Sequence, residues 1–163
     1  MSESHRTDRR FVMVRRVEFV DTDMAGIVHF TAYFRYMESA EHEMFRSLGL
    51  SMVDTEREPH LGWPRVSCSF DFISPLRFGD VLEVRIGVSL IRARSITYEA
   101  DIVRDGQVVA RGRSTSACCE VGPGVPMRPV PVPEEVRNSL QRYMISKEPE
   151  SVAKSNKVGG GTS

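Results

Sequence analysis

The sequence predicts an α+β fold in which a long central helix is wrapped by a curved antiparallel β-sheet. One amphipathic helix pattern runs from about Thr31 to Leu48, and four strand-like stretches follow it between residues 63 and 120. Because the helix has a wide apolar face, it must pack on a broad surface, and a sheet is the natural partner. The 163 residues are enough for one domain with a substantial core.

The first predicted strand is Phe11–Val20, which is rich in β-branched and aromatic residues that partly alternate with polar ones. The segment Asp21–Gly26, with two aspartates and a glycine, then breaks the strand. The change to a helical period after this segment marks the boundary between the strand and the helix.

The predicted helix carries apolar residues three and four positions apart, which places them on one face. Thr31 is the expected N-terminal cap, and Gly49 suits the left-handed backbone that ends many helices. Glu41 falls near the middle of the apolar face, so we expect it to pair with a sheet arginine or to lie at a dimer rim. The apolar face consists of Tyr33, Met37, Ala40, Met44 and Leu48, widened by Phe30, Phe34 and Phe45.

Residues Ser51–Leu61 are predicted to form a loop or a short helical turn. The strand-like stretches beyond them show the alternation of a half-buried antiparallel sheet, most clearly over residues 81–86. Asp105-Gly106 is a signal for a tight hairpin. The four predicted strands are Trp63–Ser74, Asp80–Arg92, Arg94–Arg104 and Gln107–Glu120.

After Glu120 the chain becomes rich in proline and glycine, which predicts an irregular connector. A short helix is expected over Glu134–Ile145, with Val136, Leu140 and Tyr143 facing inward. We therefore expect a single domain over residues 10–146, a flexible N-terminus over residues 1–9 and a disordered tail over residues 147–163.

Composition restricts the class of function. Lysine plus arginine equals aspartate plus glutamate, so the zero net charge gives no support for broad attraction to nucleic acid or membranes. No apolar run approaches the roughly 18 residues of a membrane span, and the N-terminus lacks a signal-peptide core. The three cysteines, Cys68, Cys118 and Cys119, are odd in number and lack metal-ligand spacing. These features favour a cytoplasmic protein with neither a disulfide scaffold nor a bound metal.

The junction between the first strand and the helix is the segment best suited to catalysis. A helix start offers unpaired N–H groups and a partial positive charge, so an acid beside it could activate water while the N–H groups hold an oxyanion. Asp23 is the candidate acid; its alternative role is to cap a turn. Asp21 is expected to be structural and to bind loop N–H groups, and Gly26 is expected to adopt a backbone geometry that a side chain would block.

A helix wrapped by a curved antiparallel sheet is the hot-dog fold, and its open sheet edge invites a two-fold dimer that joins two sheets. The stretch Val17–Val28, followed by Tyr33, Tyr36, Glu38 and Ala40, resembles the 4-hydroxybenzoyl-CoA thioesterase-like family of hot-dog proteins. The resemblance covers roughly Phe11–Glu120. It is most specific at the Asp-x-Asp-x-x-Gly pattern that ends at Gly26.

The resemblance implies an acyl-CoA thioesterase that hydrolyses a thioester to a free acid and CoA, with no cofactor besides the substrate. In this family the second aspartate of the motif, here Asp23, is the catalytic carboxylate and acts as general base or nucleophile. The backbone N–H of Phe30 would polarise the thioester carbonyl. His29 would contact the substrate or hold water near the carboxylate, and Gly26 and Tyr33 would shape the pocket.

The resemblance also implies a homodimer or homotetramer with the active site at the dimer interface. Arg92 and Arg94 flank a predicted hairpin and are suited to the phosphates of CoA, unless they belong only to a solvated strand face. Glu41 rivals Asp23, because some other hot-dog thioesterases use a helix glutamate. The alternatives are an enoyl-thioester hydratase or dehydratase and a non-catalytic acyl-thioester-binding module. The sequence leaves open the acyl group, CoA versus carrier-protein thioesters, and dimer versus tetramer.

Overall fold

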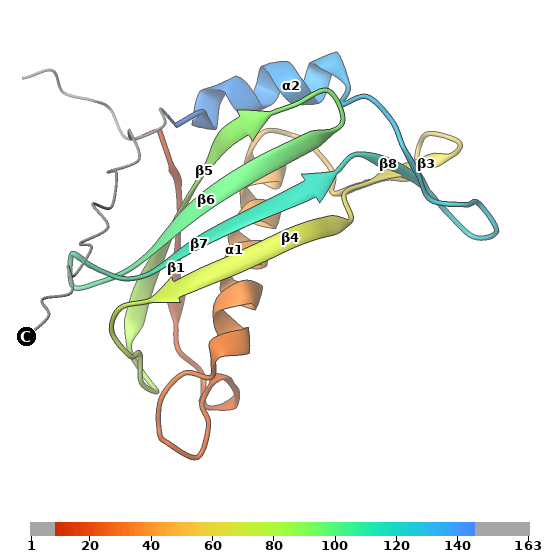
Figure 1. Cartoon of the computed structure of the whole chain (residues 1–163). Helices are drawn as coiled ribbons and strands as arrows, with labels where there is room; N and C mark the ends of the chain where they lie inside the picture. Colours follow the sequence, from red (N-terminus) through yellow and green to blue (C-terminus); the bar gives the residue numbers. More distant parts are fainter. Residues whose placement is uncertain (1–8, 146–163) are drawn as a thin grey trace, which may run out of the picture.

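The computed structural model describes residues 9–145 of the chain. Within them, one long helix, α1 (Phe30–Ser47), lies against a five-stranded antiparallel sheet, as predicted (Figure 1). The strand order, which was not predicted, is β1-β5-β6-β7-β4. The predictions for residues 1–8 and 146–163 lie outside the described residues. The strands of this sheet are β1 (Phe11–Arg16), β4 (Arg65–Phe72), β5 (Val81–Ile91), β6 (Ser95–Arg104) and β7 (Gln107–Ala117).

The core lies between α1 and the inner face of the sheet. Alternate residues of β5 point into it and are buried, because successive side chains of a strand face opposite sides. Each large apolar side chain that is fully buried contributes about 1.5–3 kcal/mol. Phe45 joins the core as predicted, whereas Phe30 is 57% exposed, so its expected place in the buried stripe is wrong. At the C-terminal end of the helix, Gly49 has the expected left-handed φ of 72°.

The first strand is shorter than predicted. It ends at Arg16, and a 3-10 turn, η1 (Phe19–Asp21), replaces its last residues. The N–H of Glu18 donates to the Asp21 side chain at 3.1 Å, and the N–H of Asp21 donates to the Glu18 carbonyl at 3.0 Å. These two bonds turn the chain away from the sheet and leave Phe19 and Val20 each 78% exposed.

A second, smaller sheet was not predicted. Its order is β2-β3-β8-β9, and β2 and β3 occupy the region expected to be a loop or helical turn. It also divides the predicted strand Gln107–Glu120 at Cys118, whose N–H donates to the Arg94 carbonyl instead of a ladder partner. Strands of two or three residues have no periodicity to detect, so only their distant partners define them. They are β2 (Val53–Asp54), β3 (His60–Gly62), β8 (Cys119–Val121) and β9 (Arg128–Pro129).

The C-terminal helix is confirmed but is shorter than predicted. It consists of α2 (Glu134–Leu140) and a 3-10 turn, η2 (Gln141–Tyr143). Val136 and Leu140 are buried against the core, as expected. Figure 1 shows α2 at the end of the molecule opposite to the loop that precedes α1.

Two further properties bear on the functional class. Within residues 9–145, no helix combines the length and the apolar character needed to cross a membrane. The same part of the chain contains no group of three or more His, Cys, Asp or Glu side chains placed to hold a metal ion. Cys118 and Cys119 are buried, whereas Cys68 is exposed on β4.

Candidate active site

The loop before α1 is a small hairpin that presents Asp23. Thr22 and Val28 form an isolated antiparallel bridge, and between them the N–H of Asp23 donates to the Ile27 carbonyl at 3.0 Å. The turn closes where the N–H of Gly26 donates to the Asp23 carbonyl at 3.0 Å. Gly26 has a φ of 73°, which confirms the prediction that this position needs a left-handed backbone.

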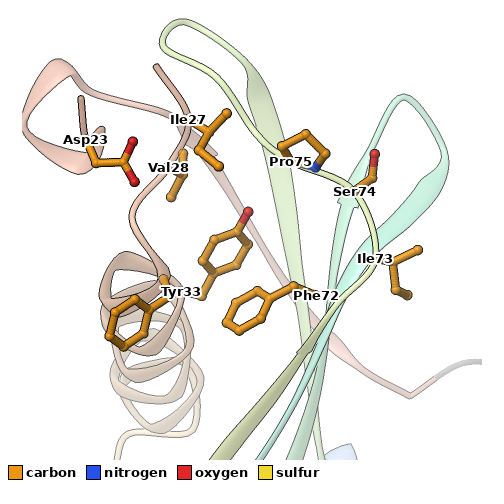
Figure 2. Close-up of a pocket in the computed structure, with 9 residues that line it drawn as sticks. Asp23, Ile27, Val28, Tyr33, Phe72, Ile73, Ser74 and Pro75 are labelled. Atoms are coloured by element: carbon orange, nitrogen blue, oxygen red, sulfur yellow. The ribbon is translucent and has the colours of Figure 1, made fainter. Parts of the chain in front are cut away.

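The Asp23 side chain has one engaged oxygen. The N–H of Ala25 donates to Oδ1 at 2.8 Å, so the turn-capping role that competed with catalysis is present. The other oxygen has no hydrogen bond within residues 9–145. Figure 2 shows the carboxylate directed toward the space bordered by Ile27, Val28 and Tyr33. Capping therefore fixes the loop without removing the carboxylate from this space.

That space is a pocket of about 450 Å³ with mostly apolar walls. Tyr33 and Phe72 meet edge to face, with ring centroids 5.0 Å apart. Tyr33 is 3% exposed, and burial raises the pKa of its hydroxyl, which keeps it protonated. The lining residues are Asp23, Ile27, Val28, Phe30, Tyr33, Phe72, Ile73, Ser74 and Pro75.

The start of α1 also opens on this pocket. Phe30 is its first residue and lines the pocket, and its N–H has no hydrogen-bond acceptor within residues 9–145. His29, rather than the predicted Thr31, is the N-cap. Its Nδ1 accepts the N–H of Thr31 at 3.4 Å and lies 2.8 Å from the Thr31 hydroxyl oxygen. His29 itself is not among the residues that line the pocket.

Asp21 holds the loop and the helix together, which confirms its predicted structural role. Its side chain is 1% exposed, accepts the N–H of Glu18 and forms an ion pair with Arg35 of α1 at 3.0 Å. Its carbonyl accepts the N–H of His29 at 2.8 Å. Burial by itself would raise the pKa of Asp21, but the nearby Tyr36 hydroxyl and the hydrogen bonds from the Glu18 N–H and from Arg35 lower it below its ordinary value of 3.8.

Glu41 lies in the core, away from this pocket. It is completely buried and pairs with Arg65 of β4 at 2.6 Å, as the sequence predicted for a carboxylate on the apolar face. The same Arg65 nitrogen donates to the hydroxyls of Ser114 and Ser116 on β7 at 2.8 and 3.1 Å. Burial raises the pKa of Glu41 although Arg65 opposes the shift. Glu41 does not border the space that Asp23 faces.

Arg92 and Arg94 lie at the other end of the sheet. They occupy the turn between β5 and β6, where the N–H of Arg92 donates to the Ser95 carbonyl at 2.8 Å. The pocket residues precede the first residue of β5, and an 11-residue strand spans about 35 Å. One chain therefore does not bring these arginines to Asp23.

The sequence did not indicate the far side of the pocket or a second pocket next to it. Residues 72–75 reach Asp23 only because β4 ends beside the start of α1. The second pocket, of about 500 Å³, shares Asp23 with the first and is bordered by other residues of the same loop. It is lined by Phe19, Thr22, Asp23, Met24, Gly26 and Phe78. The sequence predicts strand over the residues that form η1, so it gives no sign that these residues lie together.

Comparison with known proteins identifies the family of this chain. The sequence model of the thioesterase-like superfamily matches residues 17–140. The acyl-CoA thioesterase YbgC of Haemophilus influenzae is 27% identical over 130 residues, which cover 80% of this chain and 93% of that protein.

Solved structures agree with the fold. A gentisyl-coenzyme A thioesterase superposes with a TM-score of 0.68 at 28% identity, covering 80% of this chain and 98% of the other. An aspartate-to-asparagine variant of 4-hydroxybenzoyl-CoA thioesterase, in complex with 4-hydroxybenzoyl-CoA, superposes with a TM-score of 0.70 at 25% identity. That superposition covers 81% of this chain and 99% of the other. The chain thus has the hot-dog fold.

Proposed function

The chain belongs to the thioesterase-like superfamily and is a thioester hydrolase, and on this premise we propose that it cleaves acyl-CoA at the pocket beside Asp23. One observation carries the proposal. A carboxylate oxygen and the N–H of a helix start, neither of which has a hydrogen-bond partner among the described residues, border the same pocket. These are the two groups that hydrolysis of an activated ester requires.

We assign the chemical step to Asp23. As general base it takes a proton from water, and the resulting hydroxide attacks the carbonyl carbon and expels CoA as its thiolate. As nucleophile it forms a mixed anhydride, expels the same thiolate, and water then hydrolyses the anhydride. In both routes the proton released from water ends on the CoA thiolate or in solvent.

We assign the oxyanion to the N–H of Phe30. The N-terminus of the 18-residue α1 adds partial positive charge at the same point. Donors of this kind are worth about 100-fold or more in rate. Because a thioester is already activated, a carboxylate and one such donor suffice, so we propose a reaction without metal or redox cofactor.

The neighbouring residues support these two groups. Gly26 provides the left-handed turn that orients the loop carrying Asp23, and Tyr33 forms part of the pocket wall. His29 caps the helix, so we assign it a positioning role at the oxyanion donor rather than contact with substrate. This differs from the direct role that the sequence suggested.

The open edge of the sheet supports a homodimer. Every residue of β4 except Phe70 is exposed, and among the described strands β4 pairs with β7 alone. Val66 and Phe72 are 61% and 51% exposed, and Phe72 also lines the pocket. We propose that two copies pair along β4 and thereby close the pocket. Val66→Lys should then give a monomer by light scattering and a loss of turnover.

The test of the catalytic assignment is Asp23→Asn. Thiol release from a panel of acyl-CoA esters should fall by about 100-fold or more, while circular dichroism and oligomeric state stay unchanged. Asp105→Asn is the matched control, because this 91% exposed aspartate lies in a hairpin turn that asparagine also suits. Turnover of Asp23→Asn at the parent rate would refute the assignment. Loss of an enoyl chromophore without thiol release would instead indicate a hydratase.

A further inference from the structure

We propose that the second pocket beside Asp23 is the subsite for the CoA part of the substrate, with Arg16 and Arg77 binding its phosphates and Phe19 and Phe78 its adenine or pantetheine. The proposal rests on the function proposed above, since it divides one thioester between two pockets. No local sequence pattern pointed to these four residues.

The two pockets meet at a single residue. Among the lining residues in the part of the chain that the structure describes, Asp23 alone borders both. A thioester has two arms, an acyl group on one side of the reacting carbon and the CoA chain on the other. When the reacting carbon lies at Asp23, one arm enters each pocket. The first pocket, which includes the N–H of Phe30, takes the acyl group.

The second pocket presents an unusual exposed aromatic pair. Phe19 is 78% exposed and Phe78 is 65% exposed, and their rings meet edge to face with centroids 6.2 Å apart. They come from η1 and from the segment between β4 and β5. Clustered exposed rings on a soluble protein mark a binding surface. Aromatic faces of this kind suit an adenine ring, which stacks on them whatever its substituents.

Two arginines hydrogen-bond to residues in or next to this pocket, since Gly26 lines it and Gly79 follows Phe78 in the chain. Arg77 Nη1 donates to the Gly26 carbonyl at 3.3 Å, and Arg16 Nη1 donates to the Gly79 carbonyl at 3.0 Å. Both side chains are exposed, and within residues 9–145 neither guanidinium forms an ion pair with a carboxylate. The nearby Asp80 carboxylate accepts the backbone N–H of Arg77 at 2.9 Å and forms its ion pair with Arg104 at 3.0 Å. The charge of Arg77 also helps to lower the pKa of Asp80.

The charge of these arginines identifies the occupant. An unpaired guanidinium retains donors that bind phosphate strongly and with defined geometry. CoA carries phosphates, and its pantetheine arm leads from them to the sulfur that must lie at Asp23. Arg92 and Arg94, the arginines that the sequence suggested, follow the far end of β5, an 11-residue strand that spans about 35 Å.

The test compares two substrates with the same acyl group. One is the CoA thioester, and the other is the N-acetylcysteamine thioester, which lacks the phosphates and the nucleotide. Arg16→Gln and Arg77→Gln should each raise KM for the CoA ester by about tenfold, because each removes a charge-assisted bond. The kcat for that ester, and kcat/KM for the truncated ester, should remain within about twofold of the parent, the precision of such comparisons. Asp23→Asn should lose turnover of both substrates.

Binding of free CoA, measured by calorimetry, separates this proposal from the proposed function. CoA should bind the parent chain and bind the Arg16→Gln/Arg77→Gln chain at least tenfold more weakly, even if no ester is hydrolysed. Arg46→Gln is the matched control, because Arg46 is exposed and lies at the far end of α1. Phe19→Ala/Phe78→Ala should also weaken CoA binding.

Three results would overturn the proposal. In the first, the double arginine variant binds CoA as the parent does. In the second, the Arg92→Gln/Arg94→Gln variant loses CoA affinity and the Arg16→Gln/Arg77→Gln variant does not. In the third, Phe19→Ala/Phe78→Ala changes the oligomeric state without changing CoA affinity, which would make this surface an interface between copies.

Discussion

Replacing Arg65 by methionine should strongly destabilise the fold. The change leaves the Glu41 carboxylate, which is completely buried, without the guanidinium that now lies 2.6 Å away. Removing one partner of a buried ion pair costs about 3–5 kcal/mol, because the remaining charge keeps its desolvation cost. For a chain of this size that corresponds to a fall in Tm of roughly 10 °C. Methionine keeps most of the side-chain volume, so the loss is attributable to charge.

The pH dependence should identify the carboxylate responsible. Burial raises the pKa of Glu41 above its ordinary value of 4.5. A raised folded-state pKa means that stability is fully present below 4.5 and is lost as pH rises through the raised value. Without Arg65 this pKa rises further, so the variant should lose more stability than the parent between pH 4.5 and neutrality. It should regain that stability on acidification.

The assay is denaturant unfolding at a fixed protein concentration, since an oligomer's stability depends on concentration. The double variant Glu41→Leu/Arg65→Met is the control, because replacing both ions by apolar side chains removes the unpaired charge. It should recover most of the loss. The reasoning would be refuted if the free energy of unfolding of Arg65→Met were within about 0.5 kcal/mol of the parent value, which is the uncertainty of such comparisons. It would also be refuted if the double variant were no more stable than Arg65→Met.

Three further predictions concern the catalytic loop. His29→Ala should cost about 1 kcal/mol of stability and lower kcat, whereas His29→Asn, which can cap the helix, should retain both. Gly26→Ala should lower the free energy of unfolding by about 1 kcal/mol and reduce turnover, because the φ of Gly26 is 73°. The control is Gly49→Ala, at a φ of 72° outside the site, which should destabilise the fold equally without affecting kcat. Because the pKa of Asp21 is lowered in the folded state, its ionised carboxylate stabilises the fold above pH 3.8, and this contribution is lost as the pH falls below that value. The free energy of unfolding of Asp21→Asn, measured by urea titration, should therefore depend less on acid pH than that of the parent.

Much of the fold was predictable because its signals are local. The apolar period of α1 and the alternation within β5 are properties of consecutive residues, and both elements end within one residue of the predicted boundaries. The first strand was less predictable. Its last residues have strand-like composition, but hydrogen bonds between Glu18 and Asp21 turn them into η1.

The candidate site was predictable on one side only. Asp23, Gly26 and Phe30 fall within ten consecutive residues, so motif and helix start could be read together. The opposite wall comes from residues 72–75, about fifty positions later, and nothing local ties it to the motif. For the same reason, the sequence suggested Arg92 and Arg94 as phosphate ligands, whereas we propose Arg16 and Arg77 from the structure.

The sequence by itself determined that a carboxylate precedes a long amphipathic helix, that Gly26 turns the chain between them, and that Glu41 requires a buried partner. Tertiary structure alone decided that the partner is Arg65 and that the carboxylate borders two pockets. It also decided that Arg16 and Arg77, which form no ion pair with a carboxylate within residues 9–145, bond to residues in or next to one of these pockets. The physical reason is that helical and strand periods arise from neighbouring residues. Contacts between distant residues follow instead from the strand order β1-β5-β6-β7-β4 and its register, which no local pattern encodes.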